Sequence, residues 1–114
     1  MVHHFTPEEA NKILPEVSSL LSRIVELKGK LDTSTGKDRR EIMDELTVCV
    51  SKIEQLGIEV KDLDSGLIDF PAIRFHEMVY LCWKLGEGEV LFWHGVSEGF
   101  KGRKLLKPEA AQIR

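Results

Sequence analysis

The spacing of apolar residues changes once along this chain, at Gly57, and that change limits the folds open to it. Before Gly57, apolar side chains recur every three or four residues, which is the period of one face of an α-helix. After Gly57 they alternate with polar residues, which is the period of a half-buried β-strand. Helical segments first and antiparallel strands second predict an α+β domain.

The first helical segment begins with a capping box. Thr6 is a good N-cap, Glu9 stands three residues later, and Pro7 suits the first helical position. Pro15 removes a backbone donor and crowds the preceding turn. We therefore expect a kink near the start of this helix.

The second helical segment follows a polar turn at residues 32–37. A second capping box, Asp38 with Glu41, is expected to begin it, and Gly57 to end it in the left-handed conformation. Apolar residues repeat every seven positions in both segments, at 10, 17, 24 and 31 and at 42, 49 and 56. Two such stripes predict an antiparallel helical hairpin with apolar surface left over, so we expect a homodimer or higher homo-oligomer through a four-helix arrangement.

Residues 58–97 predict an antiparallel β-meander of three to four strands. A turn at residues 64–66 precedes a strand over 67–73, in which Pro71 cannot donate to a ladder and indicates an edge position or a bulge. Strands over 78–85 and 90–96 are expected to join through a tight hairpin at Gly86–Glu89. The helical hairpin, residues 5–57, should pack on this meander.

The 114 residues are interpreted as one domain, 1–114, which ends in a basic tail over 98–114. A composition of 42% hydrophobic and 31% charged residues is typical of a globular protein. The longest apolar run, residues 78–83, is too short to cross a bilayer, and the N-terminus has no signal-peptide pattern. We expect a cytoplasmic protein without a membrane segment.

The basic tail predicts little by itself. Residues 101–114 carry 5 basic and 1 acidic side chains, whereas residues 58–100 carry 3 basic and 8 acidic ones. Lys101, Arg103, Lys104 and Lys107 offer charges for phosphate, but one short cluster is a weak footprint for nucleic acid. Nucleic-acid binding therefore ranks last among the functions considered.

The strand register decides whether Cys82 and His94 can meet. A two-residue loop at Glu87–Gly88 would pair Cys82 with Trp93 and place Cys82 and His94 on opposite faces of the hairpin. A three-residue loop ending at Gly88 would place them on one face. Even then, two soft ligands fall short of the four in a structural zinc site, and Cys49 and Cys82 lack zinc-type spacing. The sequence thus predicts free buried thiols, no metal and no cofactor.

Two functions of different kinds remain open. In the two-residue register, Tyr80 and Trp93 share an aromatic outer face, which favours a non-enzymatic interaction module that binds an unknown protein partner. The alternative is a small-molecule, anion-binding or hydrolytic site at the β-hairpin. Its catalytic candidates are Asp69, Glu87 and His94, and its ligand-binding candidates are Arg74, Trp83 and Arg103.

Within that alternative, Arg103 would hold an anion, and Glu87 or His94 would carry a proton. A structural role is also open to these residues. An Asp69–Arg74 ion pair would steady the predicted edge strand, and His94 would bond to backbone at the edge of the core.

Three blocks of sequence resemble a prokaryotic family called domain of unknown function 2203. They are FTPEEANKILPEV, GIEVKDLDSGLIDFPAIR and VYLCWKLGEGEVLFWHGVSEGFKGR, within a resemblance from Phe5 to Leu105. The positions that match the family pattern are Phe5, Thr6, Asn11, Pro15, Lys61, Asp62, Gly66, Asp69, Phe70, Arg74, Cys82, Trp83, Gly86, Glu87, Trp93, His94, Gly99, Phe100, Gly102 and Arg103. The chain departs from it at Phe75-His76-Glu77. The resemblance implies an outline of the chain and no activity.

Overall fold

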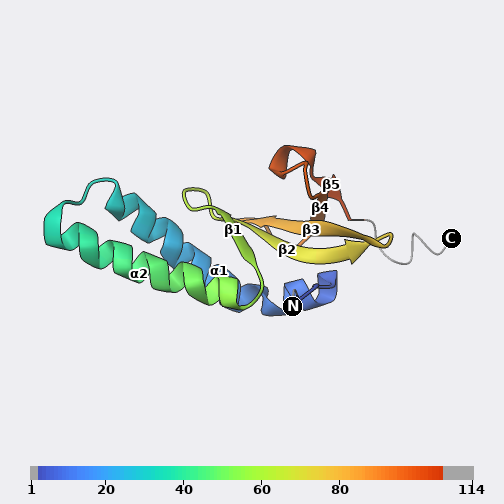
Figure 1. Ribbon diagram of the computed structural model, residues 1–114, viewed down its shortest axis with the longest axis horizontal. Coiled ribbons are helices and arrows are strands. Elements are labelled where there is room, and N and C mark those ends of the chain that lie inside the picture. Colours follow the sequence, from blue (N-terminus) through green and yellow to red (C-terminus); the bar gives the residue numbers. More distant parts are fainter. Residues whose placement is uncertain (1–2, 107–114) are drawn as a thin grey trace.

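The computed structural model describes residues 3–106 as a helical hairpin followed by a five-stranded antiparallel sheet (Figure 1). The strands lie in the order β1-β2-β3-β4-β5, so each pairs with its neighbours in the chain. The elements are α1 (Pro7–Leu31), α2 (Gly36–Gln55), β1 (Glu59–Asp62), β2 (Leu67–Arg74), β3 (Glu77–Lys84), β4 (Phe92–Gly95), the short 3-10 helix η1 (Phe100–Gly102) and β5 (Lys104–Leu105). The predicted α+β arrangement is confirmed, and the start of the basic tail supplies the fifth strand.

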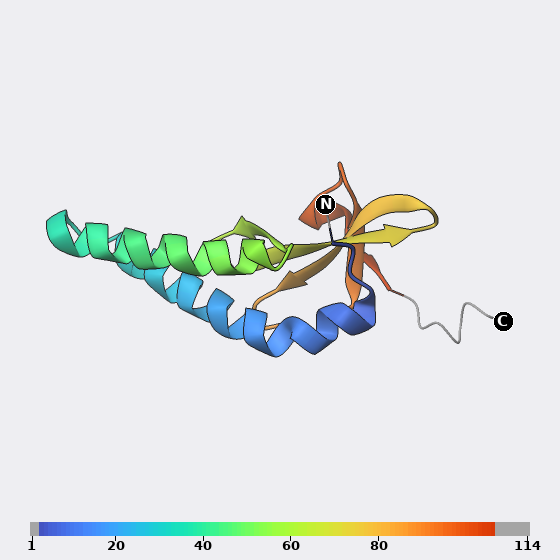
Figure 2. The same ribbon diagram turned by 60° about the horizontal axis from the view of Figure 1, so that its bottom comes forward.

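The start of α1 is the one that the sequence predicts. Glu9 N–H donates to Thr6 Oγ1 at 3.1 Å, and Thr6 N–H donates to Glu9 Oε1 at 2.9 Å, which completes the capping box. Pro15 lies inside the helix, and Figure 2 shows the axis of α1 changing direction in its first half. This bend lets α1 run along the sheet and then along α2.

The predicted start of α2 is wrong by three residues. The N-cap is Thr35, and the helix begins at Gly36 without a side-chain capping bond, so Asp38 lies inside the first turn. A carboxylate in the first turn interacts favourably with the positive end of the helix dipole, which explains an acidic residue there without a cap. Gly57 ends the hairpin with a φ of 89°, as predicted.

The main core lies between the helical hairpin and one face of the sheet. From the helices come Val17, Leu21, Ile24, Leu27 and Ile53, each at most 1% exposed. From the sheet come the side chains that point to the same side on β2 and β3, which are Ile68, Phe70, Ala72, Val79, Leu81 and Trp83. Alternation along the strands sends the intervening side chains to the other, outer face.

The prediction for Pro71 is half right. β2 is an inner strand, paired with both β1 and β3, and the bulge lies in β1 between Val60 and Asp62. The pairing with β1 extends only from Leu67 to Asp69, however, so Pro71 lies beyond it. The missing N–H of Pro71 therefore breaks no bond, and its carbonyl accepts from Phe5 N–H at 2.7 Å.

The connection between β3 and β4 is longer than the predicted tight hairpin. Lys84 ends β3 and Phe92 begins β4, so residues 85–91 join them. The register pairs Tyr80 with His94 and Cys82 with Phe92. This pairing is the one that the three-residue loop would have given, and it places Cys82 and His94 on the same face.

The described part of the chain is elongated, with extents of 59 × 27 × 26 Å. Its radius of gyration is 15.6 Å, against about 13 Å for a compact domain of this length. The far end of the helical hairpin projects beyond the sheet, as Figure 1 shows. Among residues 3–106, neither helix combines the length and the apolar composition needed to cross a bilayer.

Candidate functional site

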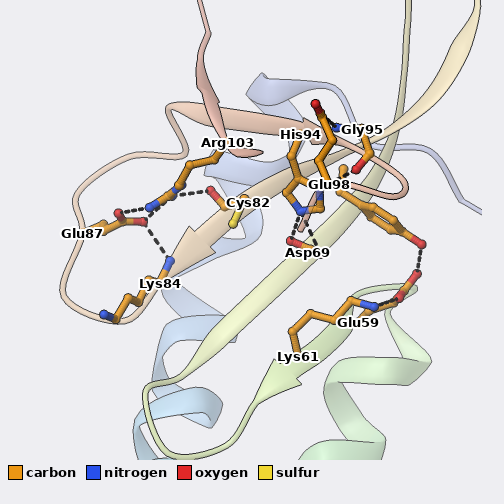
Figure 3. A network of polar contacts seen from close by, with 11 residues as sticks. Glu59, Lys61, Asp69, Cys82, Lys84, Glu87, His94, Gly95, Glu98 and Arg103 are labelled. Carbon is orange, nitrogen blue, oxygen red and sulfur yellow. Dashed lines mark hydrogen bonds and ion pairs between the residues drawn. The ribbon is translucent and has the colours of Figure 1, made fainter. Parts of the chain in front are cut away.

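The outer face of the sheet carries three buried side chains of different ligand chemistry. Asp69 of β2 pairs with Cys82 of β3, and His94 of β4 pairs with Tyr80, two residues before Cys82. One ligand atom from each of Asp69, Cys82 and His94 lies within 4.8 Å of the other two. The three residues are 3%, 0% and 2% exposed, respectively, although they lie opposite the helices. We call this group the Asp–Cys–His cluster (Figure 3).

Both ring nitrogens of His94 have partners. Nδ1 lies 2.7 Å from the carbonyl oxygen of Gly95, and Nε2 lies 3.1 Å from each carboxylate oxygen of Asp69. Because a carbonyl oxygen only accepts, Nδ1 carries a proton. Nε2 is then the nitrogen that faces Asp69, and the Nε2–carboxylate bond holds one proton between the ring and the acid.

Burial changes the acidity of the other two members. It raises the pKa of Asp69, against the lowering effect of the His94 bond. Burial, together with the neighbouring Asp69 carboxylate, raises the pKa of the Cys82 thiol to about 12. The thiol is therefore protonated near neutral pH, and the arrangement does not supply a reactive thiolate nucleophile.

The guanidinium of Arg103 holds the segment that follows β4 through a second set of polar contacts. The guanidinium donates to both Glu87 oxygens, at 2.7 and 2.9 Å, and to the Cys82 carbonyl at 3.2 Å. It also lies over the ring of Phe92, 3.9 Å from the centroid, and near that of Phe100, at 4.5 Å. Arg103 thereby ties the end of residues 96–103 to β3 and to the connection after it. Figure 1 shows η1 of this segment on the side of the sheet opposite the helices, so we call residues 96–103 the covering segment.

Glu98 and Tyr80 complete the surroundings of the cluster. Glu98 accepts from Gly95 N–H at 2.7 Å and from Lys104 at 2.8 Å, which holds the covering segment at its start. The hydroxyl of Tyr80 donates to Glu59 of β1 at 2.7 Å, which raises the pKa of Tyr80. The Tyr80 ring lies 5.6 Å from that of His94 and closes this side of the site.

The structure separates several residues that the sequence grouped together. Tyr80 pairs with His94 and Trp93 pairs with Leu81, so Tyr80 and Trp93 point to opposite faces and do not form one aromatic surface. Asp69 is paired with His94 rather than with Arg74, because residues five apart in a strand point to opposite faces. The guanidinium of Arg74 lies instead over the ring of Trp93, 5.1 Å from its centroid.

The candidates around the β3–β4 connection form contacts with one another. Trp83 is 3% exposed, and its indole N–H donates to the carbonyl of Gly88 at 2.8 Å. Glu87 accepts from Arg103 and from the backbone N–H of Lys84. A cleft of about 300 Å³ borders them, between this connection and Asn11, Pro15 and Ser18 of α1. The two groups predicted to clamp an anion and carry a proton are thus bonded to each other.

The tail provides intramolecular pairs as well. Arg103 is bonded to Glu87 and Lys104 to Glu98, so two of the four basic residues named for phosphate contact have acidic partners. Lys107, the last of the four, lies outside the described residues.

The resemblance noted from the three sequence blocks is confirmed by comparison with known families. Residues 3–106 match the family described as an uncharacterized conserved protein (DUF2203). The chain belongs to this family. No curated protein and no solved structure matches this chain.

For this DUF2203 chain, the second and third blocks supply the whole cluster. Asp69 comes from GLIDFPAIR, and Cys82 and His94 come from VYLCWKLGEGEVLFWHG, with Arg103 close behind. Sequence reasoning considered Asp69 apart from Cys82 and His94, since it lacked the register between β2 and β3. It missed Glu59 and Glu98 altogether, because neither stands in a pattern that predicts its partner.

Proposed function

We propose that this DUF2203 protein binds one divalent transition-metal ion, of the zinc class, at the Asp–Cys–His cluster. The observation that carries the proposal is the orientation of His94. Its Nδ1–H is committed to the carbonyl of Gly95, and Nε2 is aimed at Asp69 and Cys82. Metal-binding histidines typically donate their second N–H to a carbonyl or carboxylate in this way, which fixes the ring and the tautomer.

The donor set also fits this class of ion. Thiolate, imidazole and carboxylate are the three side-chain types that zinc takes, and soft sulfur disfavours magnesium and calcium. Strands β2, β3 and β4 each supply one ligand, so the sheet itself fixes their separation. A site built on paired strands holds its ligands more rigidly than one built on loops.

Three protein ligands leave one position of a tetrahedral ion for water or a small molecule. On binding, the ion would replace the proton of the Cys82 thiol and the proton shared by His94 and Asp69, and both protons would leave to solvent. This proposal concerns binding and assigns no reaction. The bonded Arg103–Glu87 pair does not supply a free anion clamp beside the cluster.

A homo-oligomeric interaction module is a second candidate function, now through the helical hairpin instead of Tyr80 and Trp93. An apolar groove on that hairpin, of about 490 Å³, favours it.

The test uses the full chain purified without chelator, followed by elemental analysis and by titration of the metal-free protein with Co²⁺. We expect one metal ion per chain and a thiolate-to-cobalt charge-transfer band with intense visible absorption, which is the signature of a tetrahedral site with sulfur. Zn²⁺ should then displace Co²⁺ and raise the unfolding temperature, because a ligand that binds only the folded state stabilises it.

The chain offers a matched control, because it holds two buried free cysteines. Cys82→Ala should remove the charge-transfer band, whereas Cys49→Ala, on α2, should keep it. Metal-free protein that gains neither absorption nor thermal stability at millimolar Zn²⁺ or Co²⁺ would contradict the proposal. The cluster would then be a structural His–Asp pair with a neighbouring thiol.

A further inference from the structure

The groove on the helical hairpin has a chemistry that suggests what fills it. Its apolar lining comes from Leu31 of α1, from Met43, Leu46 and Val50 of α2, and from Leu63 in the turn after β1. Met43 is 44% exposed, and the groove runs along α2 from Arg39 to Glu54. An apolar groove on an unpartnered helix pair is the kind of surface that another helix covers.

The residues of α2 that line this groove form a stripe whose charges and apolar side chains are complementary to those of a second, antiparallel copy. From its start to its end, it presents Arg39, Met43, Thr47, Val50 and Glu54, with Leu46 beside Thr47. In an antiparallel pair of α2 helices related by a two-fold axis between residues 46 and 47, Arg39 faces Glu54 of the other copy and Met43 faces Val50. The two apolar contacts then lie at the centre, with an ion pair at each end.

The charges at the ends of the stripe have no acidic or basic partner within residues 3–106. Arg39 donates only to the carbonyl of Leu31, at 2.8 Å, and Glu54 is exposed. Arg23 of α1, by contrast, donates to Glu45 of α2 through two bonds of 2.6 and 2.8 Å. Arg39 and Glu54 both line the groove, so their charges are available to a partner that docks there.

We propose that a second copy of this chain docks in the groove, with the two α2 helices antiparallel across a two-fold axis and Arg39 paired with Glu54 of the other copy. The stripe from Arg39 to Glu54 spans about 22 Å at 1.5 Å per residue, which suits a short four-helix interface. A dimer would also cover the projecting end of the hairpin. This inference rests on the homo-oligomeric candidate function and is independent of the metal proposal, because the Asp–Cys–His cluster lies on the outer face of the sheet.

Charge reversal tests the pairing in a way that only a two-fold arrangement predicts. Light scattering with size-exclusion chromatography and sedimentation equilibrium should show a dimer of the unmodified chain. Arg39→Glu alone and Glu54→Arg alone should each weaken it by on the order of tenfold or more, since each places like charges opposite each other at both ends. An equimolar mixture of the two variants should form a heterodimer, because both ends then pair opposite charges.

The matched control is Arg23→Glu, which breaks the internal Arg23–Glu45 pair and leaves the stripe intact. It should not change the dimer dissociation constant. Circular dichroism of every variant checks that the helices remain folded, as expected for exposed positions. An unmodified chain that stays monomeric at several hundred micromolar, or an oligomer that neither charge reversal weakens and mixing does not restore, would overturn the proposal.

Discussion

The two faces of the central sheet are made by alternate residues of the same strands, yet they are held together by different forces. On the helix side, Phe70 and Leu81 are at most 2% exposed and belong to the apolar core. On the outer side, Asp69 and His94 are as deeply buried, but they meet each other and a backbone carbonyl. These side chains are therefore equally buried on the two faces, but they are apolar on the helix side and ionisable on the outer side.

The two faces therefore differ in how much their buried side chains stabilise the fold. Apolar packing favours burial by itself, at about 25 cal/mol per Å². A buried carboxylate and imidazole lose their hydration, which costs as much as or more than their attraction returns, so an apolar pair of equal size would often be no less stable. The buried polar cluster is therefore weak evidence for stability, and the metal proposal offers another role for it.

The largest effect should come from breaking the helix side. Phe70 is fully buried and packs edge-on against Phe5, with ring centroids 5.3 Å apart. Phe70→Ala should lower the free energy of unfolding by about 3–5 kcal/mol, through lost burial and the cavity that remains. Urea denaturation measures this loss. Phe75→Ala is the control, because Phe75 is 74% exposed, and it should change the value by less than about 0.5 kcal/mol.

The second-largest effect should come from breaking the His94–Asp69 pair on the outer side. In chelator at pH 7, His94→Ala should cost about 3 kcal/mol, because it leaves the Asp69 carboxylate buried without its partner. Adding Asp69→Ala should cost little more, so the two changes should couple by about 1–3 kcal/mol in a double-mutant cycle. The exposed His4→Ala serves as the control. Strictly additive losses would show that the two side chains act separately and that the outer face resembles the inner one.

The sequence predicts the helix side of the molecule better than the outer side. Period and capping are local properties, so Thr6, Glu9 and Gly57 show where the hairpin begins and ends. The start of α2 was misplaced because Asp38 favours a first turn as much as a cap. The outer cluster depends on pairing between strands, which the loop after β3 decides. With seven residues joining β3 to β4 instead of two or three, neither loop type considered could fix the register.

The unknown strand register also explains why the sequence could not predict which candidate residues come together. His94 and Asp69 could each be singled out by type, but only the registers of β2 with β3 and of β3 with β4 bring them to Cys82. The prediction that Tyr80 and Trp93 share the outer face is wrong for the same reason, since a register shift of one residue sends one of them to the opposite face. Glu87 and Arg103, predicted as parts of one binding site, form an ion pair with each other.

The smallest effect concerns the bond that holds the covering segment over the outer face. Arg103 lowers the pKa of Glu87, chiefly through its two hydrogen bonds, so the folded state binds the proton of this carboxyl less readily than the unfolded state does. The stability that the pair contributes is therefore fully present above the unfolded pKa of about 4.3 and is lost as the pH falls through the lower, folded value. Glu87→Gln should cost about 1.5 kcal/mol at pH 7, the lower end for bonds to a charged group.

That cost should shrink as the pH falls below about 4, because protonation makes the unmodified Glu87 resemble glutamine. Urea denaturation of both proteins between pH 7 and pH 3 measures the difference, and Glu89→Gln, an exposed neighbour, should show no such trend. A cost that stays constant across this range would mean that the charge of Glu87 contributes nothing to holding the covering segment. The contacts of Arg103 with the rings of Phe92 and Phe100 would then hold the covering segment in place. Within the described part of the chain, the Asp–Cys–His cluster would be the one polar feature that distinguishes the outer face from the helix side.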